Sequence, residues 1–351
     1  MITAVVVNWN GRGYLEACLR ALFAQAPPPG EVIVVDNHSD DGSREMVASA
    51  FPAARVIDTG ANLGAAAARN RGLEAARGEF VLFLDNDVEL ELGALAALER
   101  TLAADPRCAL VQARSVVKDQ PDLCHYDAAD LHYLGTLVLH GFYAPRATAD
   151  AHMAPVGAFV ALAFLVRKDV LLALGGFDEE LFILYEDNAV SWRLRMHGWN
   201  LRLASDAICK HAGGTAGLSF RGADARYAPR RAYLHARNRW LVLTRCARWR
   251  TLLFTLPAQL LHAAVYTAFA ITRGAGIAAL RGHGAALLAL PRTLHRRRLQ
   301  RGRVVPDRAI LCASPLTSNP GLADRGAKAV LRHTLDGAYR AWWSLVRRIC
   351  G

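Results

Sequence analysis

Two aspartates separated by one residue follow a short apolar run in the first third of the chain. Residues 80–84 are apolar throughout, which is typical of a strand covered on both faces in a parallel α/β sheet, and Asp85 and Asp87 come directly after them. Because ligands of such sheets collect beyond the carboxyl ends of the strands, we expect both carboxylates to face a ligand crevice. A carboxylate pair suits Mg²⁺ or Mn²⁺, which commonly bind phosphate oxygens as well, so a metal-bridged diphosphate is predicted. The alternative is a polar turn that closes the strand.

A second apolar run, at residues 31–35, also ends in an acid. Asp36 stands at the carboxyl end of this strand, where it could accept hydrogen bonds from a nucleobase or a ribose. The polar residues 39–43 that follow are better explained as a turn and the cap of a helix.

The first strand, at residues 3–10, leads through a glycine-containing turn into a helix at residues 14–22. This order is shared with dinucleotide-binding folds. Glu16, however, stands where the G-x-G-x-x-G fingerprint needs its last glycine, so a nicotinamide cofactor is not expected.

An alanine-rich helix is predicted at residues 65–77, after the turn at residues 62–64. Small side chains allow such a helix to lie close against the sheet. Arg69 lies in this helix. Its guanidinium would pair with a diphosphate if it turned toward the crevice, and would otherwise be solvated.

Taken in order, these segments resemble the family 2 glycosyltransferases, and within them the bacterial rhamnosyltransferase-like branch. The resemblance rests on residues 5–10 (VVVNWN), 34–37 (VVDN) with 41–43 (DGS), 62–64 (NLG) with 69–72 (RNRG), and 84–87 (LDND). It implies a GT-A fold with a Rossmann-like mixed sheet flanked by helices, an inverting transfer from a nucleotide-activated sugar, and a divalent metal. It also implies that Asp36 contacts the base, Arg69 supports the nucleotide and Asp87 holds the metal. The donor site is predicted to contain Val7, Asn8, Asn10, Asp36, Arg69, Asp85 and Asn86.

A second block with the same resemblance runs from residue 175 to residue 194. Glu186 and Asp187 open a helix that Gly198 ends, and a helix cap is the simple explanation of both acids. Inverting transfer also needs a carboxylate that takes the proton of the acceptor hydroxyl, and a helix start holds such a group rigidly. The resemblance assigns this role to Asp187, and we place Glu186 and Trp192 on the acceptor side. The sequence departs from the family at Ala189, where relatives usually carry another acid.

A last strand is predicted to end at His211. A single histidine is more often structural than a ligand. The family often places a histidine here as a metal or phosphate contact, so His211 is a candidate metal ligand beside Asp87. Imidazole suits Mn²⁺ better than Mg²⁺.

Charge is divided unevenly along the chain. Residues 221–351 carry 24 Lys and Arg against 4 Asp and Glu, whereas residues 1–220 carry 18 against 27. The acidic front part suits cations and not nucleic acid, and the basic, apolar back part suits an anionic membrane surface. Seven cysteines without a C-x-x-C pair predict neither disulfides nor a zinc site, and therefore a reducing, cytoplasmic setting. The first residues have no basic region or cleavage site, so no secretory signal is expected.

The back part is predicted to be helical and to associate with a membrane. A basic helix is expected at residues 227–250, and residues 251–272 are apolar enough to span a bilayer. We favour helices lying in the plane of the membrane over a single span, with a soluble helical subdomain as the third possibility. Residues past Gly302 are expected to be loosely ordered, with a last interfacial helix at residues 338–349. The predicted parts are a catalytic domain at 1–220, a membrane-associating region at 221–302 and a tail at 303–351.

The sequence therefore predicts a metal-dependent inverting glycosyltransferase on the cytoplasmic face of the bacterial inner membrane. Its donor would be dTDP-rhamnose or a UDP-hexose, and its acceptor a glycan or lipid-linked hydroxyl in cell-envelope polysaccharide synthesis. A catalytically silent sugar-nucleotide-binding scaffold at the membrane is the alternative. A nucleotidyltransferase is a further one, although Asn8 to Gly11 is a weak phosphate-binding loop.

Overall fold

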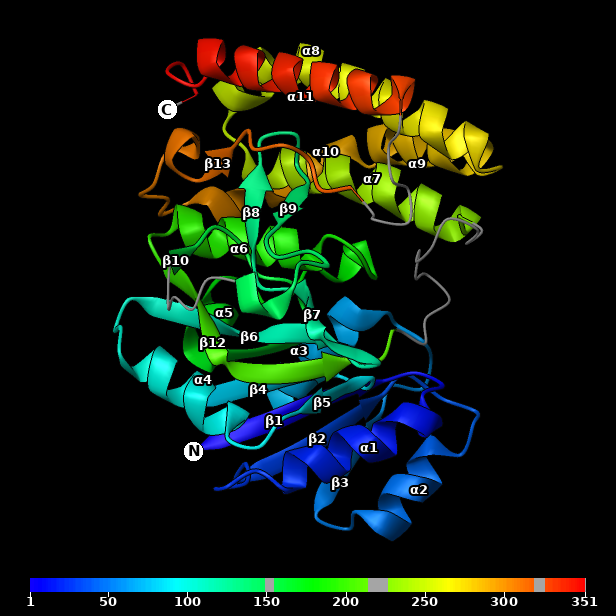
Figure 1. Cartoon of the computed structure of the whole chain (residues 1–351), viewed down its shortest axis with the longest axis vertical. Coiled ribbons are helices and arrows are strands. Elements are labelled where there is room, and N and C mark those ends of the chain that lie inside the picture. Colours follow the sequence, from blue (N-terminus) through cyan, green and yellow to red (C-terminus); the bar gives the residue numbers. More distant parts are fainter. Residues whose placement is uncertain (149–154, 214–226, 319–325, 351) are drawn as a thin grey trace.

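The computed structural model describes residues 1–148, 155–213, 227–318 and 326–350. Its N-terminal part alternates strands and helices, and the parallel strands of this part lie in the order β4-β1-β2-β3 (Figure 1). The elements are β1 (Ile2–Asn8), α1 (Arg12–Phe23), β2 (Glu31–Asp36), α2 (Ser43–Ala50), β3 (Ala54–Asp58), α3 (Ala65–Ala75) and β4 (Phe80–Asp85).

The sheet continues beyond β4 as a mixed sheet. Strand β11 runs antiparallel to both β4 and β6, and β12 runs parallel to β6. The whole order is β10-β12-β6-β11-β4-β1-β2-β3, with β5 paired to β12 and β7 paired to β6. The elements of this part are β5 (Val88–Leu90), α4 (Ala94–Ala103), β6 (Cys108–Val117), β7 (Gln120–Tyr126), β10 (Pro155–Val156), β11 (Ala163–Arg167), α5 (Lys168–Ala173), α6 (Glu186–Met196) and β12 (Asn200–His211).

Neighbouring residues of the central strands pack into two different cores. In β1, Val6 packs with residues of α1 and α4, whereas Val5 packs with residues of α3 and α6. This follows from the alternation of side chains along a strand, and it explains why these strands read as continuous apolar runs. Helix α3 lies so close to the sheet that a Cβ on Gly72 would come within 2.3 Å of Val5 Cγ1.

A layer of helices forms the end of the molecule opposite to β3 (Figure 1). It contains α7 (Pro229–Cys246), α8 (Trp249–Thr272), α9 (Gly276–Leu288), α10 (Leu290–His295) and α11 (Ala327–Val346). The basic helix expected at residues 227–250 is α7, which ends at Cys246 because Ala247 is extended at φ −73° and ψ 147°. Helix α11 begins eleven residues earlier than the interfacial helix expected at residues 338–349.

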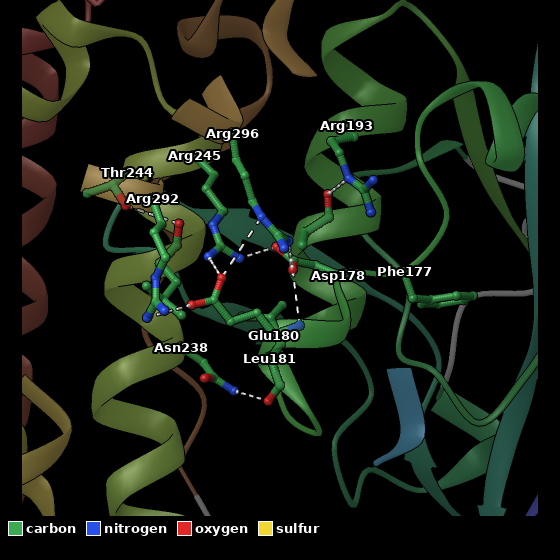
Figure 2. Close-up of polar contacts among 12 residues, drawn as sticks. Phe177, Asp178, Glu180, Leu181, Arg193, Asn238, Thr244, Arg245, Arg292 and Arg296 are labelled. Carbon is green, nitrogen blue, oxygen red and sulfur yellow. Dashed lines mark hydrogen bonds and ion pairs between the residues drawn. The ribbon is translucent and has the colours of Figure 1, made fainter. Parts of the chain in front are cut away.

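Two arginines of α7, Arg239 and Arg245, are buried against the catalytic part. Figure 2 shows Asp178 and Glu180 between Arg245 of α7 and the arginines Arg292 and Arg296 that follow α9. Arg245 is buried on this pair of acids. The expectation that the arginines of this region meet lipid headgroups is therefore wrong for Arg245, because its charge is satisfied inside the protein.

Arg239 of α7 is also internal. Its guanidinium donates to Gln259 Oε1 of α8 at 2.6 Å and to the Leu134 carbonyl at 2.8 Å. This arginine thus joins α8 to the catalytic part, and like Arg245 it is not available to a headgroup.

The segment after Gly302 is ordered through residue 318, contrary to expectation. Asp307 is fully buried and accepts hydrogen bonds from the Arg248 amide at 2.7 Å and from Thr251 Oγ1 at 2.6 Å. Strand β13 (Leu311–Cys312) then pairs with β8 (Ala129–His132), which in turn pairs with β9 (Leu137–Leu139). The prolines that suggested disorder flank a segment that buries polar and apolar side chains. The boundary predicted between residues 220 and 221 lies outside the described residues.

Candidate active site

A cavity of about 540 Å³ opens where the strands end, and both aspartates of the predicted mechanism line it. Asp87 reaches it from the segment between β4 and β5, and Asp187 from the first turn of α6. The catalytic part and the helical layer both contribute to the wall. The wall includes Val7, Arg69, Asp85, Asn86, Asp87, His125, Phe182, Tyr185, Glu186, Asp187, His211, Arg230, Arg231 and His235.

Arg69 connects the two acidic groups of the cavity. Its Nη2 donates to Asp85 Oδ1 at 2.7 Å, and its Nη1 donates to Glu186 Oε1 at 2.9 Å. The side chain is buried, so the guanidinium is held in place by the protein. Burial raises the pKa of Asp85 to about 6, although Arg69 opposes the rise. The second oxygen of Glu186 is buried and has no hydrogen-bond partner among the residues that the structure describes.

Asp87 and His211 meet on the neighbouring wall. His211 Nε2 lies 3.1 Å from Asp87 Oδ2, and His211 Nδ1 lies 2.8 Å from Nδ1 of His125. Because two protonated nitrogens cannot face each other at this distance, only one of the two Nδ1 atoms carries a hydrogen. His125 therefore orients the His211 ring toward Asp87.

Asp187 is in the environment that a general base requires. Burial and the neighbouring charge of Glu186 raise the pKa of Asp187 to about 7, against the hydrogen bond from the Asn188 amide. A carboxylate with such a pKa can both hold and release a proton near neutral pH.

The loop before Asp187 has an unusual backbone. Phe182, Leu184 and Tyr185 all have positive φ, at 64°, 71° and 74°, a conformation that non-glycine residues rarely adopt. Asn238 of α7, buried beneath the loop, satisfies its carbonyls, since its Nδ2 lies within 3.0 Å of the carbonyl oxygens of Leu181, Ile183 and Leu184.

Several predicted donor-site residues lie behind the cavity wall. Asp36 and Asn8 are fully buried and do not line the cavity. Asn8 donates to Asp36 Oδ2 at 2.8 Å, and Ser39 donates to both oxygens of Asp36 at 2.7 Å. Asn10 joins the same network through the Ser39 hydroxyl at 2.9 Å. In this structure Asp36 thus braces the loops after β1 and β2, and a direct contact with a base would require these bonds to rearrange.

Asn86 and Val7 lie at the cavity as predicted residues of the donor site. Asn86 also donates to Asn8 Oδ1 at 2.7 Å, so it links the wall to the buried network. The placement of Trp192 on the acceptor side is wrong. Trp192 is fully buried in a core that also contains Leu241 and Val242 of α7, and its indole faces Asp307. Ala189 lies in the same core, where another carboxylate would be desolvated.

Sequence reasoning missed the cavity residues His125, Arg230, Arg231 and His235. His125 lies 86 residues before His211 and has no sequence motif around it. The arginines were recognised only as part of a basic helix. The available signal was His235, four residues after Arg231, because this spacing places both side chains on one face of the helix.

The cavity contains two side chains that could bind a metal ion. Within the described part of the chain, no group of at least three His, Cys, Asp or Glu side chains is arranged to hold a metal ion. Asp87 and His211 nevertheless offer a carboxylate and an imidazole at the cavity, a pair that Mn²⁺ accepts. These two side chains fit a metal whose other ligands come from a diphosphate or from water.

The chain belongs to the family 2 glycosyltransferases. Residues 80–291 match the family described as Glycosyl transferase family group 2, and residues 3–154 match Glycosyl transferase family 2. The N-acetylglucosaminyl-diphospho-decaprenol L-rhamnosyltransferase of Mycobacterium tuberculosis is 28% identical over 226 residues, which are 57% of this chain and 72% of the relative. The putative teichuronic acid biosynthesis glycosyltransferase TuaG of Bacillus subtilis is 34% identical over 90 residues, 25% of this chain and 36% of the relative. The predicted family and its rhamnosyltransferase-like branch are confirmed.

Solved structures show the same fold. TarS 1–349 of S. aureus superimposes with a TM-score of 0.54 at 16% identity, over 99% of this chain and 90% of that chain. GalNAc-T7 with UDP, GalNAc and Mn²⁺ superimposes with a TM-score of 0.51 at 15% identity, over 66% of this chain and 47% of that chain. The GT-A prediction is confirmed, and the chain is a glycosyltransferase, so a silent scaffold is not favoured.

Proposed function

We propose that this glycosyltransferase moves a sugar, with inversion, from a nucleoside diphosphate to a hydroxyl of a lipid-linked or glycan acceptor in cell-envelope polysaccharide synthesis. The observation that carries the proposal is that Asp87 and Asp187, the latter with a pKa of about 7, line one cavity. The rhamnosyltransferase relative, whose name specifies a diphosphate-linked lipid acceptor, supports a lipid-linked acceptor and dTDP-rhamnose as the first donor to test, with UDP-hexoses second.

The chemistry follows from the residues of the cavity. Asp187 takes the proton of the acceptor hydroxyl while that oxygen forms its bond to the anomeric carbon. The bond from this carbon to the diphosphate oxygen breaks, and its electron pair leaves with the nucleoside diphosphate. Asp87 and His211 would hold Mn²⁺ or Mg²⁺, which would offset the charge of the leaving diphosphate. Arg69 holds Asp85 and Glu186 and so fixes the walls on both sides of the reacting atoms.

We also propose that the helical layer docks on a membrane, peripherally and in plane, at the cytoplasmic face of the inner membrane. Helix α8 is long and apolar enough to cross a bilayer by length and composition. One of its faces is nevertheless bonded to protein, since Gln259 donates to the Tyr133 carbonyl at 2.6 Å. Leucines on other faces are exposed, with Leu253 at 65% and Leu288 of α9 at 86%. A helix with one protein-bound face and one apolar exposed face suits an in-plane position. The division into catalytic domain, membrane-associating region and tail is part of this proposal.

A panel of nucleoside diphosphates tests the donor. Thermal stability of the purified protein should rise with one nucleotide in the presence of Mn²⁺, because a ligand that binds only the native state stabilises it. The Asp87→Ala variant should lose most of the Mn²⁺-dependent part of this stabilisation. If no nucleoside diphosphate raises the melting temperature of the wild-type protein with either metal, the proposed function is wrong.

A further inference from the structure

The first turns of helix α7 place positive charge in the wall of the catalytic cavity. Arg230, Arg231 and His235 all line the cavity. Arg231 and His235 are four residues apart, which puts both on one face of the helix. The proposed transfer step uses none of these three side chains.

Arg230 is not neutralised by an acid in the described part of the chain. Its guanidinium lies 4.6 Å from the centre of the Phe182 ring, and it has no hydrogen bond or ion pair with a described residue. Three acids of the same cavity have other partners, because Asp85 and Glu186 bind Arg69 while Asp87 contacts His211. The positive charge of Arg230 is therefore available to a ligand.

The pKa of His235 is consistent with positive charge in this part of the cavity wall. Burial, together with the positive charges of Arg231, Arg239 and His283, lowers the pKa of His235 to about 3. Its ring lies against Tyr185, whose hydroxyl is 3.0 Å from His235 Nε2. The neutral ring thus fixes this wall beside the loop that carries the base, while the arginines supply the charge.

The first turns of α7 contact both the loop that precedes the base and helix α8. Phe182, under Arg230, belongs to the loop that leads directly into Glu186 and Asp187. His235 of α7 also stacks on Tyr266 of α8, with ring centres 4.3 Å apart. An acceptor that keeps its lipid near α8 and α9 and its sugar at Asp187 would place its phosphates beside this part of α7.

We propose that Arg230 and Arg231 bind the diphosphate of a lipid-linked acceptor. Guanidinium groups recognise phosphates through paired, charge-assisted hydrogen bonds. The diphosphate of the donor is assigned to a different part of the same cavity, at Asp87 and His211. This inference rests on the proposed function, and it adds that the acceptor is recognised by its phosphates as well as by its sugar.

Titration with a lipid diphosphate and with a nucleoside diphosphate shows which of the two the arginines bind. The Arg230→Gln/Arg231→Gln variant and the wild-type protein would each be titrated with undecaprenyl diphosphate in neutral detergent, and separately with UDP or dTDP plus Mn²⁺. The control is Arg250→Gln/Arg281→Gln, which removes two exposed arginines outside the cavity. We expect the dissociation constant for undecaprenyl diphosphate to rise at least about tenfold in the first variant alone, with the nucleotide affinity unchanged.

The outcomes decide the proposal without relying on catalysis. Unchanged undecaprenyl diphosphate affinity in the first variant would overturn it, and so would an equal loss in the control. A loss of nucleotide affinity alone would assign the arginines to the donor and overturn it as well. In transfer assays, the KM for a diphosphate-linked acceptor should rise while that for the same sugar on a neutral alkyl chain stays the same. Failure of the wild-type protein to transfer any sugar would refute the proposed function and leave the binding result standing.

Discussion

The Asp187 carboxylate combines position and acidity in the way that inverting transfer requires. Its pKa is raised to about 7 by burial and by Glu186, and it lines the cavity that also contains Asp87. A carboxylate with an ordinary pKa would be a weaker base toward a hydroxyl group.

The rate of transfer should therefore depend on pH through Asp187. The base acts only when it is ionised, and the ionised fraction grows as pH rises toward about 7. We expect kcat to increase about tenfold per pH unit below this value and to level off above it. A pH profile under saturating donor and acceptor measures this, and a profile that is flat from pH 5 to pH 8 would contradict it.

Single residues also mark what the sequence could predict about the site. Asp85 and Asp87 could be predicted from the sequence, because an apolar strand followed directly by acids is a local pattern. The pairing of Arg69 with Glu186 could not be predicted, since it joins residues 117 positions apart. Asp36 and Trp192 had suitable types for ligand contact, but their burial depends on how loops and the C-terminal helices pack over them.

At the scale of elements, the loop at residues 182–185 connects a short 3₁₀ turn (Glu179–Leu181) to helix α6 and determines where the base lies. Residues with positive φ cost energy that the surroundings must offset. Asn238 helps to offset this cost through its hydrogen bonds to the carbonyls of Leu181, Ile183 and Leu184.

Asn238 is thus expected to position the base without contacting substrate. In Asn238→Asp the carboxylate oxygens would face these carbonyls and displace the loop. A displacement of about 1 Å can cost roughly 100-fold in rate, so kcat should fall by this order while the affinity for nucleotide changes little. Steady-state kinetics and nucleotide titration test this together. A variant with normal kcat, or one that loses nucleotide affinity to the same degree, would show that Asn238 has a different role.

The strands and helices around the sheet could largely be predicted, because apolar runs and glycine turns are local signals. The change from a basic to an apolar sequence also predicted the division between α7 and α8, at residue 250, four residues after α7 ends at Cys246. The pairing of β13 with β8 could not be predicted, because a strand of two residues has no periodic pattern in the sequence.

The whole molecule places its apolar surface at one end, on α8, α9 and α11 (Figure 1). The ion pairs of Asp178 and Glu180 with Arg245 fix this layer to the segment that precedes the base. Docking of the layer on a membrane would therefore also orient the cavity with respect to lipid-linked acceptors.

Vesicle binding tests the docking surface. Leu253→Ser/Leu288→Ser should reduce co-sedimentation with vesicles that contain anionic lipid, because both side chains are exposed on the helical layer. Leu92→Ser is the control, since Leu92 is 78% exposed but lies before α4, in the catalytic part. Equal loss in the control, or no loss in the double variant, would argue against membrane docking through α8 and α9.

The most direct measurement compares Asp187→Asn with the wild-type protein for sugar transfer and for nucleotide affinity. The substitution keeps the shape of the side chain and its acceptor for the Asn188 amide, but removes the proton acceptor. We predict a loss of about 100- to 10,000-fold in kcat, with the dissociation constant for the nucleoside diphosphate and Mn²⁺ unchanged. A variant that transfers sugar at the wild-type rate would contradict the account, because the base would then be another group.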